Sequence, residues 1–303
     1  MVKMQRWKSK LQVRGVIMKK VVKFGGSSLA NAEQFQKVGD IIRSDESRRY
    51  VVPSAPGKRF DDDIKVTDML YGCYDAASKG EDITEKINAI KARYYEIIKG
   101  LGLSLSLEEE FKKIDEDFRA QAGIQYAASR GEFLNGKIMA AYLGYDFVDA
   151  ASVIRFDKAG NLEAEETNKL LSKKLSKSQH AVIPGFYGAC ADGTVKTFSR
   201  GGSDVTGSLV AKAIHADIYE NWTDVSGFLV TDPRIVHNPE PIEAITYREL
   251  RELSYMGATV LHEDAIFPVR KEGIPINIRN TNSPEDKGTL IVESTCKKPK
   301  FTI

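Results

Sequence analysis

The chain has 303 residues, of which 42% are hydrophobic, so it can bury the core of one large α/β domain or of two small ones. Lys and Arg number 44 against 42 Asp and Glu, a balance that argues against a nucleic-acid-binding protein with a strong basic field. No apolar run approaches the roughly 18 residues that a membrane span needs, which argues against a membrane partner.

Cysteines and histidines are few and lie far apart in the sequence. None of them has the spacing of a metal site or of a secreted disulfide framework, so we expect no metal-ligating residues and a cytoplasmic location. They are Cys73, Cys190, Cys296, His180, His215, His237 and His262.

Residues 1–17 contain five basic residues and no acidic one. A transit peptide has such a composition, but this segment is short and poor in serine. We favour an extension outside the core, with Met18 as the natural start.

The first half of the chain predicts two strands and several helices. Residues 19–24 form a β-branched run that ends in two glycines, typical of a strand entering a tight loop, and Asn31 can cap a helix to about Arg43. A second strand is expected over 50–53, followed by a mobile surface loop over 54–63. Helices are expected over 66–120, with breaks near Gly80 and 100–102, and over 125–143.

The second half alternates between strands and helices. Strands are expected over 181–184, 195–198, 216–222, 274–278 and 289–292, and a helix over 205–215. Such alternation implies an α/β fold with a mostly parallel sheet and helices on both faces.

The motif Lys-Phe-Gly-Gly-Ser-Ser at 23–28 follows the first strand. Its glycines let the backbone approach an anion closely, successive N–H groups can bind phosphate oxygens, and Lys23 adds a positive charge. It is not a P-loop, because no Gly-Lys-Ser/Thr follows at the required spacing. A plain strand-to-helix turn is the alternative interpretation.

A second glycine turn, Ser-Arg-Gly-Gly-Ser-Asp, lies at 199–204. Arg200 is placed to bind a carboxylate through two parallel hydrogen bonds, whereas Ser203 or Asp204 can simply cap the next helix. Ligands of open α/β sheets bind at the carboxyl ends of the strands. Two such turns, one with lysine and one with arginine, therefore indicate a site for two anions, as in a kinase.

Four further residues have both a functional and an ordinary interpretation. Glu132 can pair with a substrate ammonium or be a solvated helix residue. Thr67 can contact substrate or cap a helix. Asp224 and Arg234 can contact the ribose and phosphates of a nucleotide, or belong to common turns.

These motifs, in this order, resemble the catalytic domain of the aspartokinase branch of the amino acid kinase family. The matching segments are 23–28, 66–70, 131–132, 184–186, 200–204, 222–224, 231–234 and 257–262. The resemblance covers nearly the whole chain, from about Val21 to Val292.

The resemblance implies a three-layer αβα sandwich over 18–295, with the amino acid bound toward the N-terminal part and ATP toward the C-terminal part. It implies Mg²⁺, held mainly through phosphates, and phosphorylation of the side-chain carboxylate of L-aspartate to 4-phospho-L-aspartate, the first step toward lysine, threonine and methionine. The implied site residues are Lys23, Gly25, Gly26 and Ser27 at the γ-phosphate, Thr67, Glu132, Arg200 and Ser203 around aspartate, Asp204 in the catalytic centre, and Thr223, Asp224 and Arg234 around the nucleotide.

The sequence departs from the family pattern in three places. Thr259 stands where a lysine often binds ATP phosphates, and Leu229 stands where a tyrosine often lines the nucleotide site. Residues 296–303 resemble the start of an ACT region, which aspartokinases continue into and which contributes to their dimers. We therefore expect a truncated chain whose homodimer is weak.

Two other functions stay open at this point. One is a kinase for glutamate, acetylglutamate, carbamate or a nucleoside monophosphate, although Trp222-Thr223-Asp224 argues against these. The other is a catalytically silent subunit that binds ATP or aspartate without turnover.

Overall fold

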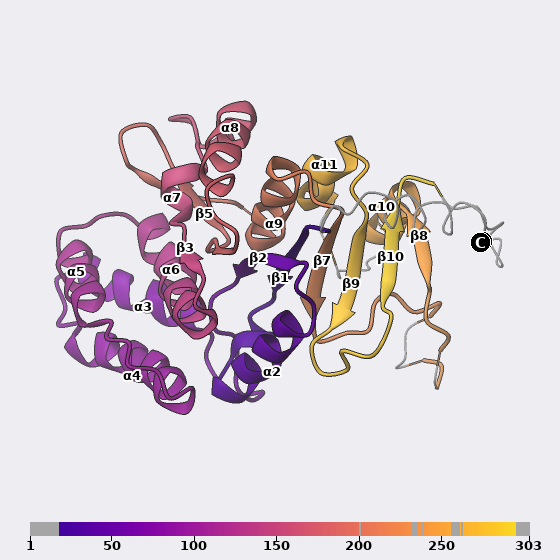
Figure 1. The fold of residues 1–303 in the computed structure, drawn as a ribbon. Helices are drawn as coiled ribbons and strands as arrows, with labels where there is room; N and C mark the ends of the chain where they lie inside the picture. The colour runs from indigo at the N-terminus through magenta and orange to yellow at the C-terminus, as the bar shows by residue number, and fades with distance from the viewer. Residues whose placement is uncertain are drawn as a thin grey trace.

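The structure is a computed structural model that describes residues 18–199, 201–231, 235–237, 239–255, 261 and 263–294. Its centre is an eight-stranded sheet with the order β3-β4-β2-β1-β7-β9-β10-β8 (Figure 1). Neighbouring strands are parallel except β9 and β10, which are antiparallel. The predicted, mostly parallel sheet is therefore confirmed.

The sheet strands are β1 (Lys20–Phe24), β2 (Arg48–Pro53), β3 (Asp146–Phe147), β4 (Ala181–Val182), β7 (Ile218–Thr223), β8 (Ala244–Thr246), β9 (Ile276–Asn280) and β10 (Thr289–Val292). A separate antiparallel hairpin holds β5 (Tyr187–Ala189) and β6 (Val195–Thr197). The strand predicted over 195–198 thus exists, but it lies outside the main sheet.

The helices are η1 (Ser27–Leu29), α2 (Ala32–Arg43), α3 (Val66–Ser78), α4 (Thr84–Gly100), α5 (Glu108–Arg119), α6 (Ile124–Leu143), α7 (Ala150–Val153), α8 (Ala164–Leu175), α9 (Gly202–Ala213), α10 (Tyr247–Tyr255) and α11 (Glu263–Lys271). The breaks expected near Gly80 and 100–102 separate α3, α4 and α5. Asn31 caps α2, as expected, by accepting a hydrogen bond from the Gln34 N–H at 2.9 Å.

Two hydrophobic clusters cover the two faces of the sheet. Successive side chains of a strand point to opposite faces, so Val21 joins the cluster formed with α7 to α11, and Val22 and Phe24 join the cluster formed with α2 to α6. In Figure 1, α9 and α11 lie on one side of the sheet and α2 lies on the other. This arrangement confirms a three-layer αβα sandwich.

The segment after β2 differs from the predicted surface loop. It contains no regular secondary structure up to α3, but Ala55, Pro56 and Gly57 are buried, and only the part from Lys58 to Asp62 is continuously exposed. The buried part packs against the loop that follows β1.

Among the described helices, none is both long and apolar enough to cross a membrane.

A buried cluster of charges lies at the amino ends of β1, β2 and β7. Glu220, which is 1% exposed, accepts hydrogen bonds from Lys20 Nζ at 3.1 Å, Arg48 Nε at 2.8 Å and Trp222 Nε1 at 2.9 Å. Burial raises the pKa of Glu220, but Arg48 and Lys20 outweigh that effect and the net shift is downward. This carboxylate is therefore held in its charged form.

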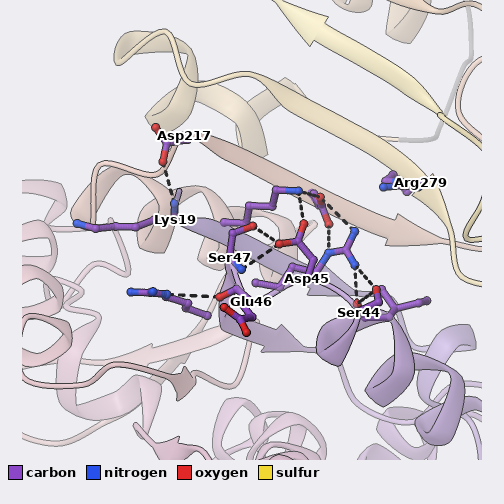
Figure 2. Close-up of polar contacts among 12 residues, drawn as sticks. Lys19, Ser44, Asp45, Glu46, Ser47, Asp217 and Arg279 are labelled. Carbon is purple, nitrogen blue, oxygen red and sulfur yellow. Dashed lines mark hydrogen bonds and ion pairs between the residues drawn. The ribbon is translucent and has the colours of Figure 1, made fainter. Parts of the chain in front are cut away.

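Asp45 extends the same cluster toward the surface (Figure 2). Its carboxylate accepts hydrogen bonds from Lys20 Nζ at 2.7 Å and from the Ser47 N–H at 2.9 Å. Next to it, the backbone N–H of Lys19 donates to Asp217 at 2.8 Å and ties the start of β1 to the start of β7 (Figure 2). The charged groups here compensate one another, which is typical of a structural network.

Candidate active site

A lysine, an aspartate and an asparagine meet at the carboxyl ends of β1 and β7. Lys23 Nζ lies 2.7 Å from Asp204 Oδ1 and donates to Asn221 Oδ1 at 3.4 Å. Asn221 Nδ2 donates to the same Asp204 oxygen at 2.9 Å. The side chains of Lys23 and Asp204 remain 11% and 15% exposed, so this triangle lies at the edge of the core and not deep inside it.

The fold explains how these three side chains meet. Lys23 and Asn221 are register partners on parallel strands, so they point to the same face of the sheet. Asp204 lies in the first turn of α9, where the positive end of the helix dipole favours a carboxylate. The turn into α9 uses Gly201 with φ +54°, a left-handed conformation that favours glycine. The structure thus brings the two glycine turns together.

The loop that follows β1 offers backbone donors beside this triangle. The Gly25 N–H donates to the Trp222 carbonyl at 3.0 Å, whereas the N–H groups of Gly26 and Ser27 have no hydrogen-bond partner among the described residues. A Cβ atom placed on Gly25 would lie 3.8 Å from Lys23 Nζ, so the ammonium lies against the loop backbone. Two free donors and an ammonium fit a phosphate group.

Gly26 also contacts the loop that follows β2. The Gly57 N–H donates to the Gly26 carbonyl at 2.8 Å, and a Cβ atom on Gly26 would lie only 2.9 Å from the Ala55 carbonyl oxygen. The two loops therefore approach so closely that a side chain at position 26 would displace one of them.

Arg93 of α4 holds the second loop in place. Its buried guanidinium donates to the carbonyls of Gly57 at 3.0 Å and Ile64 at 3.1 Å, and it lies 3.0 Å from Asp63. Arg59 also binds Asp63, at 2.9 Å. Nothing in the sequence singles out Arg93, because an arginine within a helix normally indicates a solvated face.

Glu132 of α6 is a buried carboxyl group with incomplete hydrogen bonding. The residue is 6% exposed, and its Oε2 is buried without a hydrogen-bond partner in the part of the chain that the structure describes. Burial raises the pKa of Glu132 to about 8, although the Ala55 N–H and the Arg130 guanidinium oppose the shift. A cation that reached this oxygen would favour the ionised form of the carboxyl group.

Thr67 lies close to Gly131, the residue before Glu132. It is the second residue of α3, whose N-cap is Lys65 and which has no side-chain cap, so the capping interpretation of Thr67 is wrong. Its Oγ1 is 3.8 Å from the position that a Cβ atom on Gly131 would occupy. The hydroxyl group therefore lies beside the Gly131–Glu132 segment of α6.

Ser203 lies next to Asp204 in the first turn of α9 and is 9% exposed. The N-cap of this helix is Gly201, and no side chain caps it, so the capping interpretation of Ser203 or Asp204 is also wrong. A Cβ atom on Gly185 would lie 2.5 Å from Ser203 Oγ, which places the segment after β4 against this turn. Arg200 lies outside the described residues.

Thr223 and Asp224 end β7 on the same edge of the sheet. Their side chains are 3.2 Å apart, and the loop after β9 joins them because the Thr281 N–H donates to the Thr223 carbonyl at 2.8 Å. Thr281 Oγ1 is in turn 2.8 Å from Ser28 Oγ, a connection that the sequence analysis missed. Arg234 and Thr259 lie outside the described residues, and Leu229 is 36% exposed.

Asn221 is the site residue that sequence reasoning should have found. It lies in a strand whose neighbouring residues are buried, and it is itself 2% exposed. A polar residue in a strand of buried residues needs a hydrogen-bond partner, and the sequence shows this pattern.

No group of three His, Cys, Asp or Glu side chains in the described part of the chain could hold a metal ion.

The fold and the site define an α/β protein with a parallel sheet covered on both faces and a polar cluster at the carboxyl edge, where such folds bind ligands. The chain belongs to the amino acid kinase family, whose model matches residues 18–280.

Individual relatives narrow the comparison. The chain is 40% identical to aspartokinase 3 of Bacillus subtilis over 90% of this chain and 63% of that protein. It superimposes on the aspartate kinase of Clostridium acetobutylicum with a TM-score of 0.88 and 52% identity, covering 93% of this chain and 64% of that one. Aspartokinase III of Escherichia coli in complex with lysine and aspartate gives a TM-score of 0.81 at 28% identity, covering 94% of this chain and 67% of that one. The chain therefore spans about two thirds of the length of these relatives.

Proposed function

We propose that this chain is the catalytic part of an ATP-dependent aspartate kinase, which transfers the γ-phosphoryl group of ATP to the side-chain carboxylate of L-aspartate. The product would be 4-phospho-L-aspartate, an acyl phosphate on the route to lysine, threonine and methionine. The observation that carries the proposal is the Lys23–Asp204 pair between two glycine turns, with Ala55 contacting both the first of these turns at Gly26 and α6 at Gly131, the residue before Glu132. Support also comes from the family, since E. coli aspartokinase III has been solved with aspartate and ADP.

The proposed reaction needs no general base. A free aspartate side chain has a pKa of about 3.9 and is already ionised at neutral pH. The barrier is the approach of this anion to an anionic phosphate, so catalysis rests on positioning and on stabilisation by cations and N–H groups. Lys23 Nζ and the N–H groups of Gly26 and Ser27 are the groups proposed to stabilise the transferring phosphoryl group, with Gly25 shaping the loop.

Asp204 would then orient other groups and would not abstract a proton. Its Oδ1 is already shared by Lys23 at 2.7 Å and Asn221 at 2.9 Å, which fixes the lysine ammonium at the loop. Mg²⁺, when bound with ATP, supplies charge neutralisation at the phosphates. Asp204 is the carboxylate of this triangle and would contribute at most one protein ligand, consistent with a metal held mainly through phosphates.

Specificity for an amino acid with an additional acid group would come from the α6 and α9 side of the site. Glu132 is proposed to bind the substrate ammonium, Arg200 and Ser203 one carboxylate, and Thr67 to contact the same substrate. A tight pocket would separate aspartate from glutamate, which is one methylene longer, by only about 1–3 kcal/mol on size alone. Thr223, Asp224 and Arg234 are proposed to contact the nucleotide.

Trapping the acyl phosphate with hydroxylamine tests this proposal. Purified protein with ATP and Mg²⁺ should give a hydroxamate with aspartate and much less with glutamate, acetylglutamate or carbamate. A reaction without ATP measures the background. Folded protein that gives no hydroxamate from aspartate would favour a catalytically silent ligand-binding subunit, and a stronger signal with another acid would reassign the substrate.

A further inference from the structure

A second buried polar side chain lies one helical turn after Glu132. Asn135 is 0% exposed and belongs to the same helix, α6, and residues three apart on a helix share a face. Neither the motif comparison nor the proposed mechanism uses this residue.

The hydrogen bond to Ser54 fixes which way the amide of Asn135 points. Asn135 Nδ2 donates to the Ser54 carbonyl at 2.6 Å, and a carbonyl oxygen can only accept. The amide nitrogen must therefore face Ser54, and Oδ1 must point away from it. This Oδ1 atom is buried and has no hydrogen-bond partner among the described residues.

Glu132 repeats the same pattern. Its Oε2 is also buried and has no partner within the described ranges, while the Ala55 N–H acts on the carboxyl group from the loop that follows β2. Ser54 C=O and Ala55 N–H belong to one peptide unit, so Asn135 and Glu132 bind the two ends of the same peptide. In each side chain one polar atom bonds to this peptide, and one acceptor oxygen has no hydrogen-bond partner among the described residues.

Two unpaired acceptors within one helical turn, one of them a carboxylate oxygen, suit a ligand with several N–H donors and a positive charge. Unpaired buried acceptors are costly, and native proteins normally satisfy them with a protein group, water or a ligand. A primary ammonium has three donors and can serve both oxygens at once.

We infer that Asn135 is a second binding residue for the substrate ammonium, with its Oδ1 accepting a hydrogen bond beside Glu132. This inference rests on the proposed function, since the ligand is the α-ammonium of the amino acid substrate. It also gives the Ser54–Ala55 peptide a positioning role, because the same loop continues to Gly57, which donates to Gly26 in the loop after β1.

The test compares aspartate with succinate, which has the same carbon chain and both carboxylates but no ammonium. Calorimetric titration of the folded protein gives both dissociation constants without requiring turnover. In Asn135→Leu, affinity for aspartate should fall about tenfold while affinity for succinate changes by less than about twofold, because only aspartate donates to Oδ1. Asn135→Ser, which is too short to reach, should behave in the same way and serves if the leucine variant does not fold.

Two variants separate ligand contact from a structural role. Asn135→Asp keeps an acceptor oxygen but loses the Nδ2 donor to the Ser54 carbonyl, so a retained preference for aspartate in this variant shows that the acceptor oxygen, and not the bond to Ser54, sets the preference. Tyr94→Phe removes the 2.8 Å hydrogen bond from Tyr94 to the Gly131 carbonyl on the same helix, and it should also leave the preference unchanged. An equal loss of aspartate and succinate binding in the leucine and serine variants would overturn the inference.

Failure of the proposed function and failure of the Asn135 inference give different results. Wild-type protein that binds aspartate better than succinate but forms no acyl phosphate contradicts the kinase proposal and leaves the Asn135 measurement valid. Wild-type protein that makes acyl phosphate, with Asn135→Leu keeping the full preference for aspartate, overturns only the role of Asn135.

Discussion

Two clusters of charged residues share the strands β1 and β7, with their lysines three residues apart on β1, and they are built in opposite ways. At the amino ends of β1 and β7, Lys20 and Arg48 surround Glu220, whose side chain is 2% exposed. At the carboxyl ends, Lys23 meets Asp204, and these side chains are 11% and 15% exposed. Because side chains alternate along a strand, Lys20 and Lys23 point to opposite faces of the sheet.

The difference between the clusters lies in how completely each charge is satisfied. Glu220 accepts four hydrogen bonds from three residues, which uses its roughly four lone-pair sites and leaves none for a ligand. Lys23 contacts one carboxylate and one amide and lies beside a loop with two N–H groups that no described residue binds. A saturated charge network stabilises the fold, whereas an incomplete one at a strand's carboxyl end indicates a binding site.

The largest effect is expected on stability, from Glu220→Ala. Removing this carboxylate leaves the buried Arg48 and the half-buried Lys20 without their common partner, which should cost about 3–5 kcal/mol of unfolding free energy. Urea unfolding measures the loss. Glu33→Ala, which removes the exposed partner of Lys37, is the control and should cost about 0.5 kcal/mol or less. A loss below about 1 kcal/mol for Glu220→Ala would contradict a structural role for this cluster.

The second effect is expected on turnover, from Lys23→Ala. Losing the ammonium that stabilises the transferring phosphoryl group should lower kcat about 100- to 1000-fold, comparable to the loss of one oxyanion-hole donor. Steady-state kinetics with ATP and aspartate measure kcat, and a thermal melt checks that the variant is folded. The control is Lys37→Ala, which removes an exposed lysine. A kcat within about tenfold of wild type, under about 1.4 kcal/mol, would remove Lys23 from the chemical step.

The third effect is the pH dependence of stability expected from Glu132, whose pKa is raised whereas that of Glu220 is lowered. Burial raises the pKa of Glu132 to about 8 from 4.5, so the folded protein retains a proton that the unfolded chain loses within this interval. The stability contribution of this carboxyl group is therefore complete below pH 4.5 and is lost as the pH rises toward 8. Urea unfolding from about pH 5 to about pH 9 should show this slope in the wild type but not in Glu132→Gln.

The same ionisation should appear in ligand binding with the opposite sign. An ammonium needs the charged carboxylate, so affinity for aspartate should rise with pH, by up to about tenfold per unit, and level off above about 8. Equal affinity for aspartate across this range would contradict the assignment of Glu132 to the substrate ammonium.

The smallest effect separates two adjacent glycines in the loop beside Lys23. A Cβ atom on Gly26 would lie 2.9 Å from the Ala55 carbonyl oxygen, so Gly26→Ala should cost about 1–3 kcal/mol of stability. A Cβ atom on Gly25 would meet nothing closer than 3.7 Å, so Gly25→Ala should cost less. Thermal unfolding of both variants compares them, and equal losses would show that the contact between the two loops does not limit this position.

Much of the fold could be predicted because local signals agreed with it. The β-branched run before Gly25 predicted β1, and Asn31 marked the start of α2. The alternation of strands and helices predicted a mostly parallel sheet, at whose carboxyl edge Lys23 and Asp204 lie 2.7 Å apart. The two capping predictions failed because the backbone of Gly201 and Lys65 begins α9 and α3 without a side-chain cap.

The remaining parts of the site depend on long-range contacts that the sequence does not reveal. Arg93 binds carbonyls 29 and 36 residues away, and Thr281 reaches a serine 253 residues away. Asn135 resembles any polar helix residue until its burial is known. Backbone carbonyls and hydroxyl groups of distant segments leave no pattern in the chain, so only the folded structure identifies these partners.

Arg93 has a practical consequence for protein engineering. Because its guanidinium binds the carbonyls of both Gly57 and Ile64, it closes the base of the exposed excursion between them. The structural effects of changes in length or composition near Asp61 and Asp62 should therefore not extend past the Arg93 contacts to Gly26. This excursion is accordingly a suitable place to insert an epitope or a fluorescent label that reports on the protein without disturbing the loop that contacts Lys23.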